Sequence, residues 1–213
     1  MQFHVEIHDQ QFYRKRKIAE AQLQQCLSSN QNKEKLTLYC SLLLLKSTDL
    51  GVQTYCAIII RKVFLPNEKE ETNELFKILS PDNKNQLKLN LLNALQSINN
   101  SSLRKKVADA TICFFSLIQE NEEKWDELLK YIISLFNLEL NETNFSNIEL
   151  GLHLLANVYS LAYDELKEGV QLFLKNFNVY FKCNSLSLII FPIKIKISLK
   201  LLRKILGSLF DKS

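Results

Sequence analysis

The stretch SSLRKKVADATICFF, residues 101–115, decides the fold, because it places a very small residue within an apolar helical face. The segment opens with a polar cap, turns basic and then becomes apolar on one side, with Ala108 near the middle of that side. Two helix axes approach to roughly 8–10 Å only where the side chains at the contact permit it. Ala108 therefore predicts a point at which another helix crosses closely.

The same arrangement recurs along the chain, because the predicted helices come in pairs and the first helix of the other pairs carries Ala19, Ala57 or Gly151. The intervals between the four positions are 38, 51 and 43 residues. HEAT and armadillo units repeat every 40–47 residues or so, and each unit stacks on its neighbours because one hairpin cannot cover its own apolar face. The pattern predicts an all-α solenoid whose units nestle at these four residues. The alternative that stays open is an ordinary helical bundle with irregularly spaced small residues.

The hydrophobic periodicity predicts helices that alternate with short polar breaks. Helix-start signals precede several of them, including the STD at residues 47–49 and the NNSS at 99–102, and Pro66 is expected to end one. The expected helices span about 9–27, 34–46, 50–65, a short one near Leu75, 83–98, 101–115, 121–136, 146–161 and 163–177.

Composition narrows the function classes. Only four Gly and three Pro occur among 213 residues, which disfavours turn-rich strand folds and Gly-rich phosphate cradles. Residues 1–177 are mildly acidic, because the excess of Lys and Arg lies in residues 178–213. A nucleic-acid-binding face needs cations clustered along the body, so we expect no direct nucleic-acid partner.

Residues 178–213 differ from the body and form a separate, divergent basic tail in our division of the chain. Residues 193–199 alternate Ile or Leu with Lys or Ser, a two-residue period that favours a strand, and a terminal helix is expected after them. Pro192 and the lysines interrupt the apolar run well short of the roughly 20 residues that span a membrane. We therefore expect no membrane partner.

No convincing catalytic or metal-binding constellation is present, so we expect neither enzymatic activity nor a cofactor. His4 and His8 lie one helical turn apart but lack a third ligand nearby, and His153 is expected to pack with one nitrogen satisfied. The basic run YRKRK at 13–17 is interpreted as a solvated helix face rather than a targeting signal. The cysteines are isolated, without a C-x-x-C pair, and are interpreted as small buried hydrophobes: Cys26, Cys40, Cys56, Cys113 and Cys183.

Several segments together resemble the N-terminal HEAT repeats of importin-β-type nuclear transport receptors, most closely the importin-beta-three branch. They are ALQSINNSSLRKK, SSLRKKVADATICFF, EKWDELLKYIISLF, VQTYCAIIIRKVF and IELGLHLLANV. The resemblance covers residues 13–177, with its strongest block at 91–136. It implies that residues 1–177 carry about four repeats of a longer solenoid.

The resemblance further implies a receptor that shuttles between cytoplasm and nucleus through the nuclear pore. Its expected partners are the GTP form of the small GTPase Ran, basic cargo signals and phenylalanine-rich nucleoporins. In a stacked solenoid the second helix of each pair lines the concave wall. The polar positions opposite the apolar stripes of those helices are our candidate protein-binding residues: Asn93, Gln96, Glu123, Asp126 and Lys130. A helical-repeat scaffold or adaptor without a transport role is the alternative.

Overall fold

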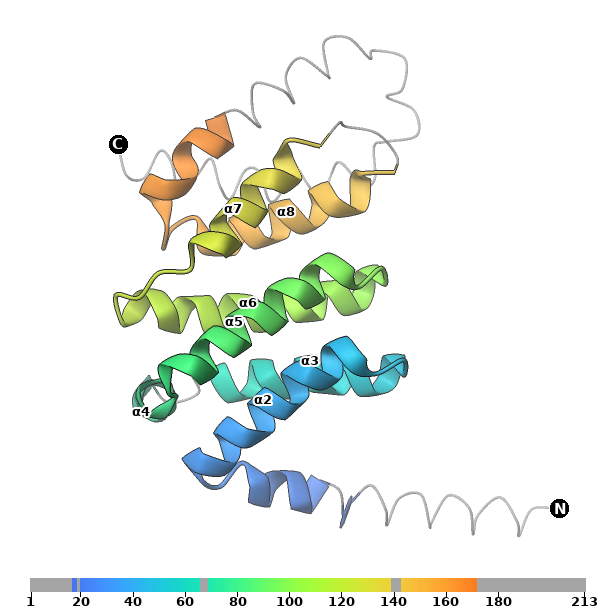
Figure 1. The fold of residues 1–213 in the computed structure, drawn as a ribbon, viewed down its shortest axis with the longest axis vertical. Coiled ribbons are helices and arrows are strands. Elements are labelled where there is room, and N and C mark those ends of the chain that lie inside the picture. The colour runs from blue at the N-terminus through green and yellow to red at the C-terminus, as the bar shows by residue number, and fades with distance from the viewer. Residues whose placement is uncertain (1–16, 19, 66–68, 139–142, 172–213) are drawn as a thin grey trace, which may run out of the picture.

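The computed structural model describes residues 17–18, 20–65, 69–138 and 143–171, and every regular element in these ranges is helical (Figure 1). This confirms the all-α class for the described residues. The helices are α2 (Asn30–Lys46), α3 (Leu50–Phe64), α4 (Lys69–Ile78), α5 (Pro81–Ser97), α6 (Ser101–Glu120), α7 (Asp126–Phe136) and α8 (Phe145–Val158). Residues 20–26 and 163–171 are also helical. The expectations for Ala19, His4, His8, Cys183 and residues 178–213 fall outside the described residues.

Side-chain caps fix where four of the helices begin. Ser29, Asp49, Ser80 and Asn100 each accept a hydrogen bond from a backbone N–H in the first turn of the helix that follows. These donors have no partner within the helix, so each cap stabilises a helix start. The cap at Ser29 also explains why α2 begins four residues before the expected start at Glu34.

The helices form two layers. In Figure 1, α2, α5 and α7 lie toward the viewer and form the front layer, while α3, α6 and α8 lie behind them and form the rear layer. Within the rear layer, α6 packs against both α3 and α8, and within the front layer α2 packs against α5. The helices of each layer therefore follow one another along the long axis of the molecule.

The closest pairs across the layers are α2 with α3, α5 with α6, and α7 with α8. The sequence pattern, in which the helices of Ala57, Ala108 and Gly151 are each the first of a pair, instead predicts that each of them pairs with a helix that follows it. The difference has a local cause, because turns of only three residues, 47–49 and 98–100, join the first two pairs. Short connections hold consecutive helices antiparallel and adjacent.

Four aromatic side chains form the centre of the core, with Phe114 of α6 between the others. Its ring centroid lies 4.8 Å from that of Phe64, 5.9 Å from that of Phe76 and 6.0 Å from that of Trp125. All four residues are buried. One side chain of α6 thereby ties together α3, α4 and the start of α7.

The described small residues occupy two kinds of position. Ala57 and Ala108 are fully buried, on α3 and α6, which pack against each other. Gly151 lies on α8, and a Cβ atom built there would approach Leu135 Cβ and Phe136 Cε1 of α7 to 3.1 Å. The close approach at Gly151 therefore involves its hairpin partner α7, whose last turn carries these two large side chains.

The cysteines divide into buried and exposed. Cys40 and Cys56 are buried between α2 and α3, and the hydrogen bond between their thiols, together with burial, raises the pKa of Cys40. Cys113 is half-buried. Cys26 is exposed, so the expectation that it is buried is wrong. Its helix lies at the end of the described stack, where fewer neighbours cover it (Figure 1).

Candidate protein-binding surface

The structure places four of the five candidate binding residues on adjacent helices of the front layer. Asn93 and Gln96 lie near the end of α5, half-buried and exposed respectively, while Asp126 and Lys130 are exposed on α7. Tyr131 Oη donates to Leu95 O at 3.1 Å, and Lys88 Nζ donates to Lys124 O at 2.9 Å. These two contacts show that α5 and α7 run side by side in the same direction. Lys130 is consequently level with the end of α5 that carries Asn93 and Gln96.

Glu123 differs from the other four, because it lies outside the helices and already has a partner within the chain. It lies in the loop before α7 and pairs with Lys84 of α5, with 2.6 Å between Oε1 and Nζ. Lys84 is only 13% exposed in its side chain, and its Nζ lies 3.9 Å from the centre of the Phe76 ring. Sequence periodicity could not reveal this pair, because the two residues are 39 positions apart. Glu123 therefore holds the loop against α5 and is not a free surface acid.

Arg104 is a second residue whose role the sequence did not reveal. Its guanidinium donates to Leu95 O at 2.6 Å, to Asn147 Oδ1 at 2.6 Å and to Tyr131 Oη at 2.8 Å. These bonds connect α6 to α5, α7 and α8, and burial raises the pKa of Tyr131, while the neighbouring Arg104 charge opposes that rise. We call the contacts of Arg104, Tyr131, Lys84 and Glu123 between α5 and its neighbours the closed seam.

The front layer also carries an apolar patch that the sequence analysis did not identify. Tyr39 is 64% exposed and Leu42 36% exposed on α2, and Leu89 is 52% exposed on α5. A run of four leucines at 42–45 was the available signal, because successive residues of a helix point about 100° apart and cannot share one buried face. Leu44 is buried, whereas Leu42 faces outward.

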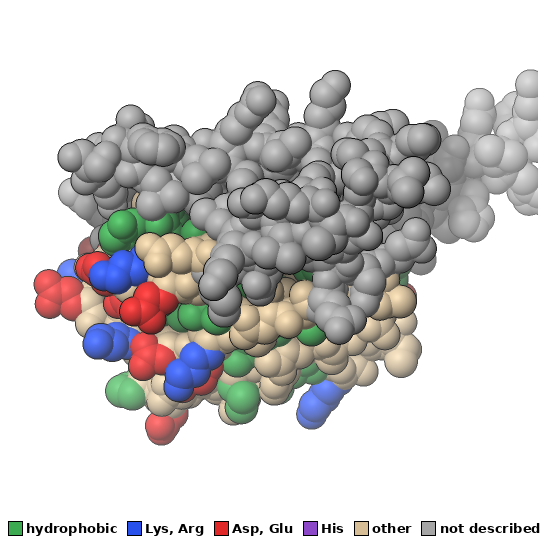
Figure 2. All heavy atoms as spheres, turned by 90° about the horizontal axis from the view of Figure 1, so that it is seen from above, with side chains coloured by type: hydrophobic (Ala, Val, Ile, Leu, Met, Phe, Trp, Pro, Cys, Tyr) green, Lys and Arg blue, Asp and Glu red, His purple; other side chains and the backbone are tan. Residues whose placement is uncertain are grey.

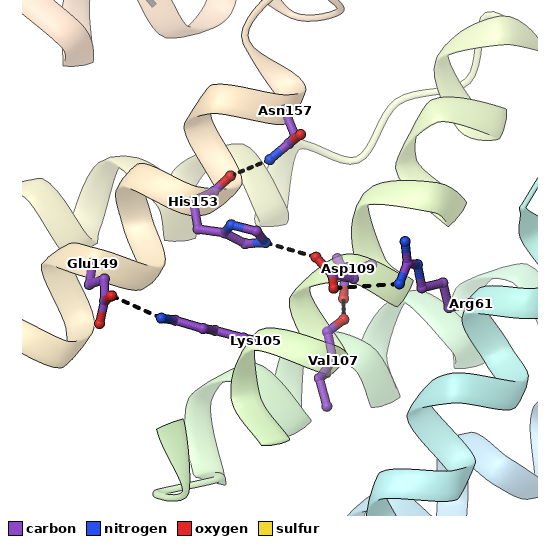
Figure 3. Close-up of polar contacts among 8 residues, drawn as sticks. Arg61, Lys105, Val107, Asp109, Glu149, His153 and Asn157 are labelled. Carbon is purple, nitrogen blue, oxygen red and sulfur yellow. Dashed lines mark hydrogen bonds and ion pairs between the residues drawn. The ribbon is translucent and has the colours of Figure 1, made fainter. Parts of the chain in front are cut away.

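The rear layer is joined by a row of polar contacts (Figure 3). Asp109 of α6 lies between Arg61 of α3, at 3.8 Å, and His153 of α8, whose Nε2 is 2.8 Å from Asp109 Oδ1. Lys105 and Glu149 pair at 2.8 Å alongside. His153 is half-buried with one ring nitrogen engaged, which agrees with the sequence expectation.

The surroundings of Cys113 give no support to nucleophilic chemistry at this row. Burial raises the pKa of its thiol, although Arg61 opposes the shift, whereas a reactive cysteine needs a lowered pKa. Within the described residues no group of three or more His, Cys, Asp or Glu side chains could hold a metal ion. Nor is any described helix both long and apolar enough to cross a membrane.

Figure 2 looks onto the end of the stack, and on its visible described part the Lys and Arg side chains lie among those of Asp and Glu. A field of one sign is what attracts nucleic acid, and this visible part does not carry one.

Comparison with known proteins adds no relative: no family model matches the chain, and no curated protein or solved structure matches it at a significant level. The assignment of function accordingly depends on the residues and the geometry described above.

Proposed function

We propose that the chain is a protein-binding scaffold built as a HEAT-type solenoid, and that it acts as a nuclear import receptor. The observation that carries the proposal is the two-layer stack of helical hairpins, in which one layer presents exposed side chains from successive helices. Such stacks bind partners along an extended wall, without chemistry of their own.

The partners we propose follow from the resemblance of residues 13–177 to importin-β-type receptors. The front layer would contact the GTP form of Ran and basic cargo signals, and the rear layer would contact phenylalanine-rich nucleoporin segments. Exchange of cargo for Ran requires that the two ligands compete or favour different arrangements of the stack. The protein would then shuttle between cytoplasm and nucleus.

A pull-down tests the transport role. Immobilised Ran loaded with GTP should retain the full chain, and Ran loaded with GDP should not. Equal retention by both forms, or retention by neither, would contradict the role and favour a scaffold without a transport function. Retention by neither form needs a folding control, for which the far-ultraviolet circular dichroism of the same preparation is sufficient.

A charge exchange on α7 locates the contact. The double variant Asp126→Lys and Lys130→Glu keeps the net charge and alters only exposed positions. It should lower stability by no more than about 1 kcal/mol, because it places a cation in the first turn of α7, where the helix dipole favours an acid. Retention by Ran·GTP should fall if these residues line the site. Glu123 is unsuitable for this purpose, because reversing its charge would also disturb the largely buried Lys84.

A further inference from the structure

The exposed residues of α2 form a single stripe. Lys35, Tyr39, Leu42 and Lys46 follow one another at intervals of four, three and four residues, and all are exposed. Residues three or four apart lie on the same side of a helix. The stripe is roughly opposite Cys40 and Leu44, which are buried.

The adjacent helix extends the apolar part of the stripe. Asn83 donates to Glu34 Oε1 at 2.6 Å, and Asn90 donates to Ser41 Oγ at 2.9 Å. Both contacts join residues 49 positions apart, so α2 and α5 run parallel, and Leu89 is level with the interval between Tyr39 and Leu42. Tyr39, Leu42 and Leu89 together make the apolar patch of the front layer.

A lysine stands at each end of the patch. Lys35 and Lys46 are eleven residues apart on α2, which corresponds to about 16 Å along a helix. Neither lysine has an ion-pair partner among the described residues. By contrast, Lys84 and Lys88 on the next helix are both engaged by Glu123. The two α2 cations are thus available to carboxylates of a partner.

From this arrangement we propose that the patch binds an acidic amphipathic peptide segment of a partner protein. Its apolar side chains cover Tyr39, Leu42 and Leu89, and a carboxylate near each end pairs with Lys35 and Lys46. Charge complementarity at the rim of an apolar contact selects the partner and speeds association. This site rests on the proposed protein-binding function and adds to it the chemical class of one partner. It does not require Ran.

Another exposed apolar stripe, on α3, makes a matched control. Tyr55 of α3 is 67% exposed, close to the value for Tyr39, and it lies on the other helix of the same hairpin. The stripe around it begins at Asp49, whose carboxylate already caps α3. It ends at the exposed Lys62, but four residues before Tyr55 it has Gly51 where the α2 stripe has Lys35. It can therefore pair with only one of the two carboxylates of such a peptide.

The experiment measures binding of labelled synthetic helical peptides to the full chain by fluorescence anisotropy. The first probe has leucine and phenylalanine on one face and glutamates about eleven residues apart, to match the lysine spacing. The second has lysines in place of the glutamates. We expect the glutamate probe to bind at least about tenfold more tightly, and the difference to shrink at high salt.

Reversal of the two lysine charges identifies the site. In the double variant Lys35→Glu and Lys46→Glu the preference should reverse in favour of the lysine probe. Tyr39→Ser should weaken both probes about tenfold, as truncation of a central tyrosine often does, whereas Tyr55→Ser should leave both unchanged. Thermal melts of each variant check that the fold persists.

Three results would overturn the proposal: equal binding of both probes, an unchanged preference in the double variant, or an equal effect of Tyr39→Ser and Tyr55→Ser. A photo-reactive amino acid at position 39 tests other occupants. Cross-linking to the chain's own terminal residues or to a second copy would also overturn it. Retention by Ran·GTP is measured on the same variants, so that failure of this site and failure of the transport role give different results.

Discussion

The two halves of the front layer differ in whether their side chains find partners within the chain. Between α5 and α7, the closed seam satisfies its polar groups internally, through Arg104, Tyr131 and the pair of Lys84 with Glu123. On α2, apolar and basic side chains remain exposed, as Tyr39, Leu42 and the two flanking lysines show. The same helical layer can thus be fixed at one place and left available at another. The contrast predicts that substitutions at the closed seam reduce stability, whereas those on α2 alter binding.

The largest effect is expected at the core beneath the closed seam. Phe114→Ala removes the ring that contacts Phe64, Phe76 and Trp125 at once, and should lower the free energy of unfolding by about 3–5 kcal/mol. Chemical denaturation measures the loss. Ile78→Ala on α4, where the side chain is exposed, is the control and should change little. A loss for Phe114→Ala no greater than the control would refute the central position of this ring.

Next in size is the loss of the seam's polar centre. Arg104→Met should cost about 2–4 kcal/mol, because hydrogen bonds of a charged group are lost and the half-buried Asn147 and Tyr131 lose a partner. Lys105→Met removes only an exposed ion pair with Glu149 and should cost about 0–1 kcal/mol. Equal losses in the two variants, compared by denaturant titration, would show that the seam is not closed in solution.

A smaller effect should follow from enlarging Ala108, the buried small residue of α6. Ala108→Leu adds volume to a fully buried position on α6 and should cost about 1–3 kcal/mol through strain against the side chains that surround it. Ala21→Leu, on the exposed helical stretch 20–26, is the comparison. Melting temperatures of the pair distinguish close packing at Ala108 from simple tolerance of leucine.

The smallest effect on stability is expected on the open half. Tyr39→Ser should change the free energy of unfolding by about 0.5 kcal/mol or less, as is usual for exposed positions. A loss of several kcal/mol would mean that Tyr39 is covered by another part of the chain, and the contrast between the two halves would then disappear.

Local sequence signals predicted the helices well, because caps and periodicity act within one turn. Asp49 and Asn100, which lie within the start signals at 47–49 and 99–102, cap α3 and α6. Ser80 caps α5 and Pro81 begins it, two residues before the expected start at 83. The pairing of helices is harder to predict from the sequence, because it depends on contacts between distant residues. The turns at 47–49 and 98–100 are only three residues long, and this length favours pairing of the helices that they join over the pairing that the small residues suggest.

The candidate surface could be predicted only in part, for a similar reason. Helical periodicity identifies polar positions, but it does not show whether a distant lysine neutralises an acid, as Lys84 does for Glu123. Nor does it show which apolar side chains outside the buried stripe stay uncovered, as Leu42 and Leu89 do. These features depend on which faces of neighbouring helices meet, and no local pattern encodes that.

Hydrogen exchange of the full chain under native conditions tests the contrast between the halves most directly. Segments near global stability exchange only when the whole protein unfolds, whereas loosely covered segments open locally. We predict the slowest exchange in α6 around Phe114 and in the adjoining turns of α5 and α7, with α2 opening at a lower free energy. Exchange from α2 as slow as from α6, or faster exchange from the closed seam than from α2, would contradict the account.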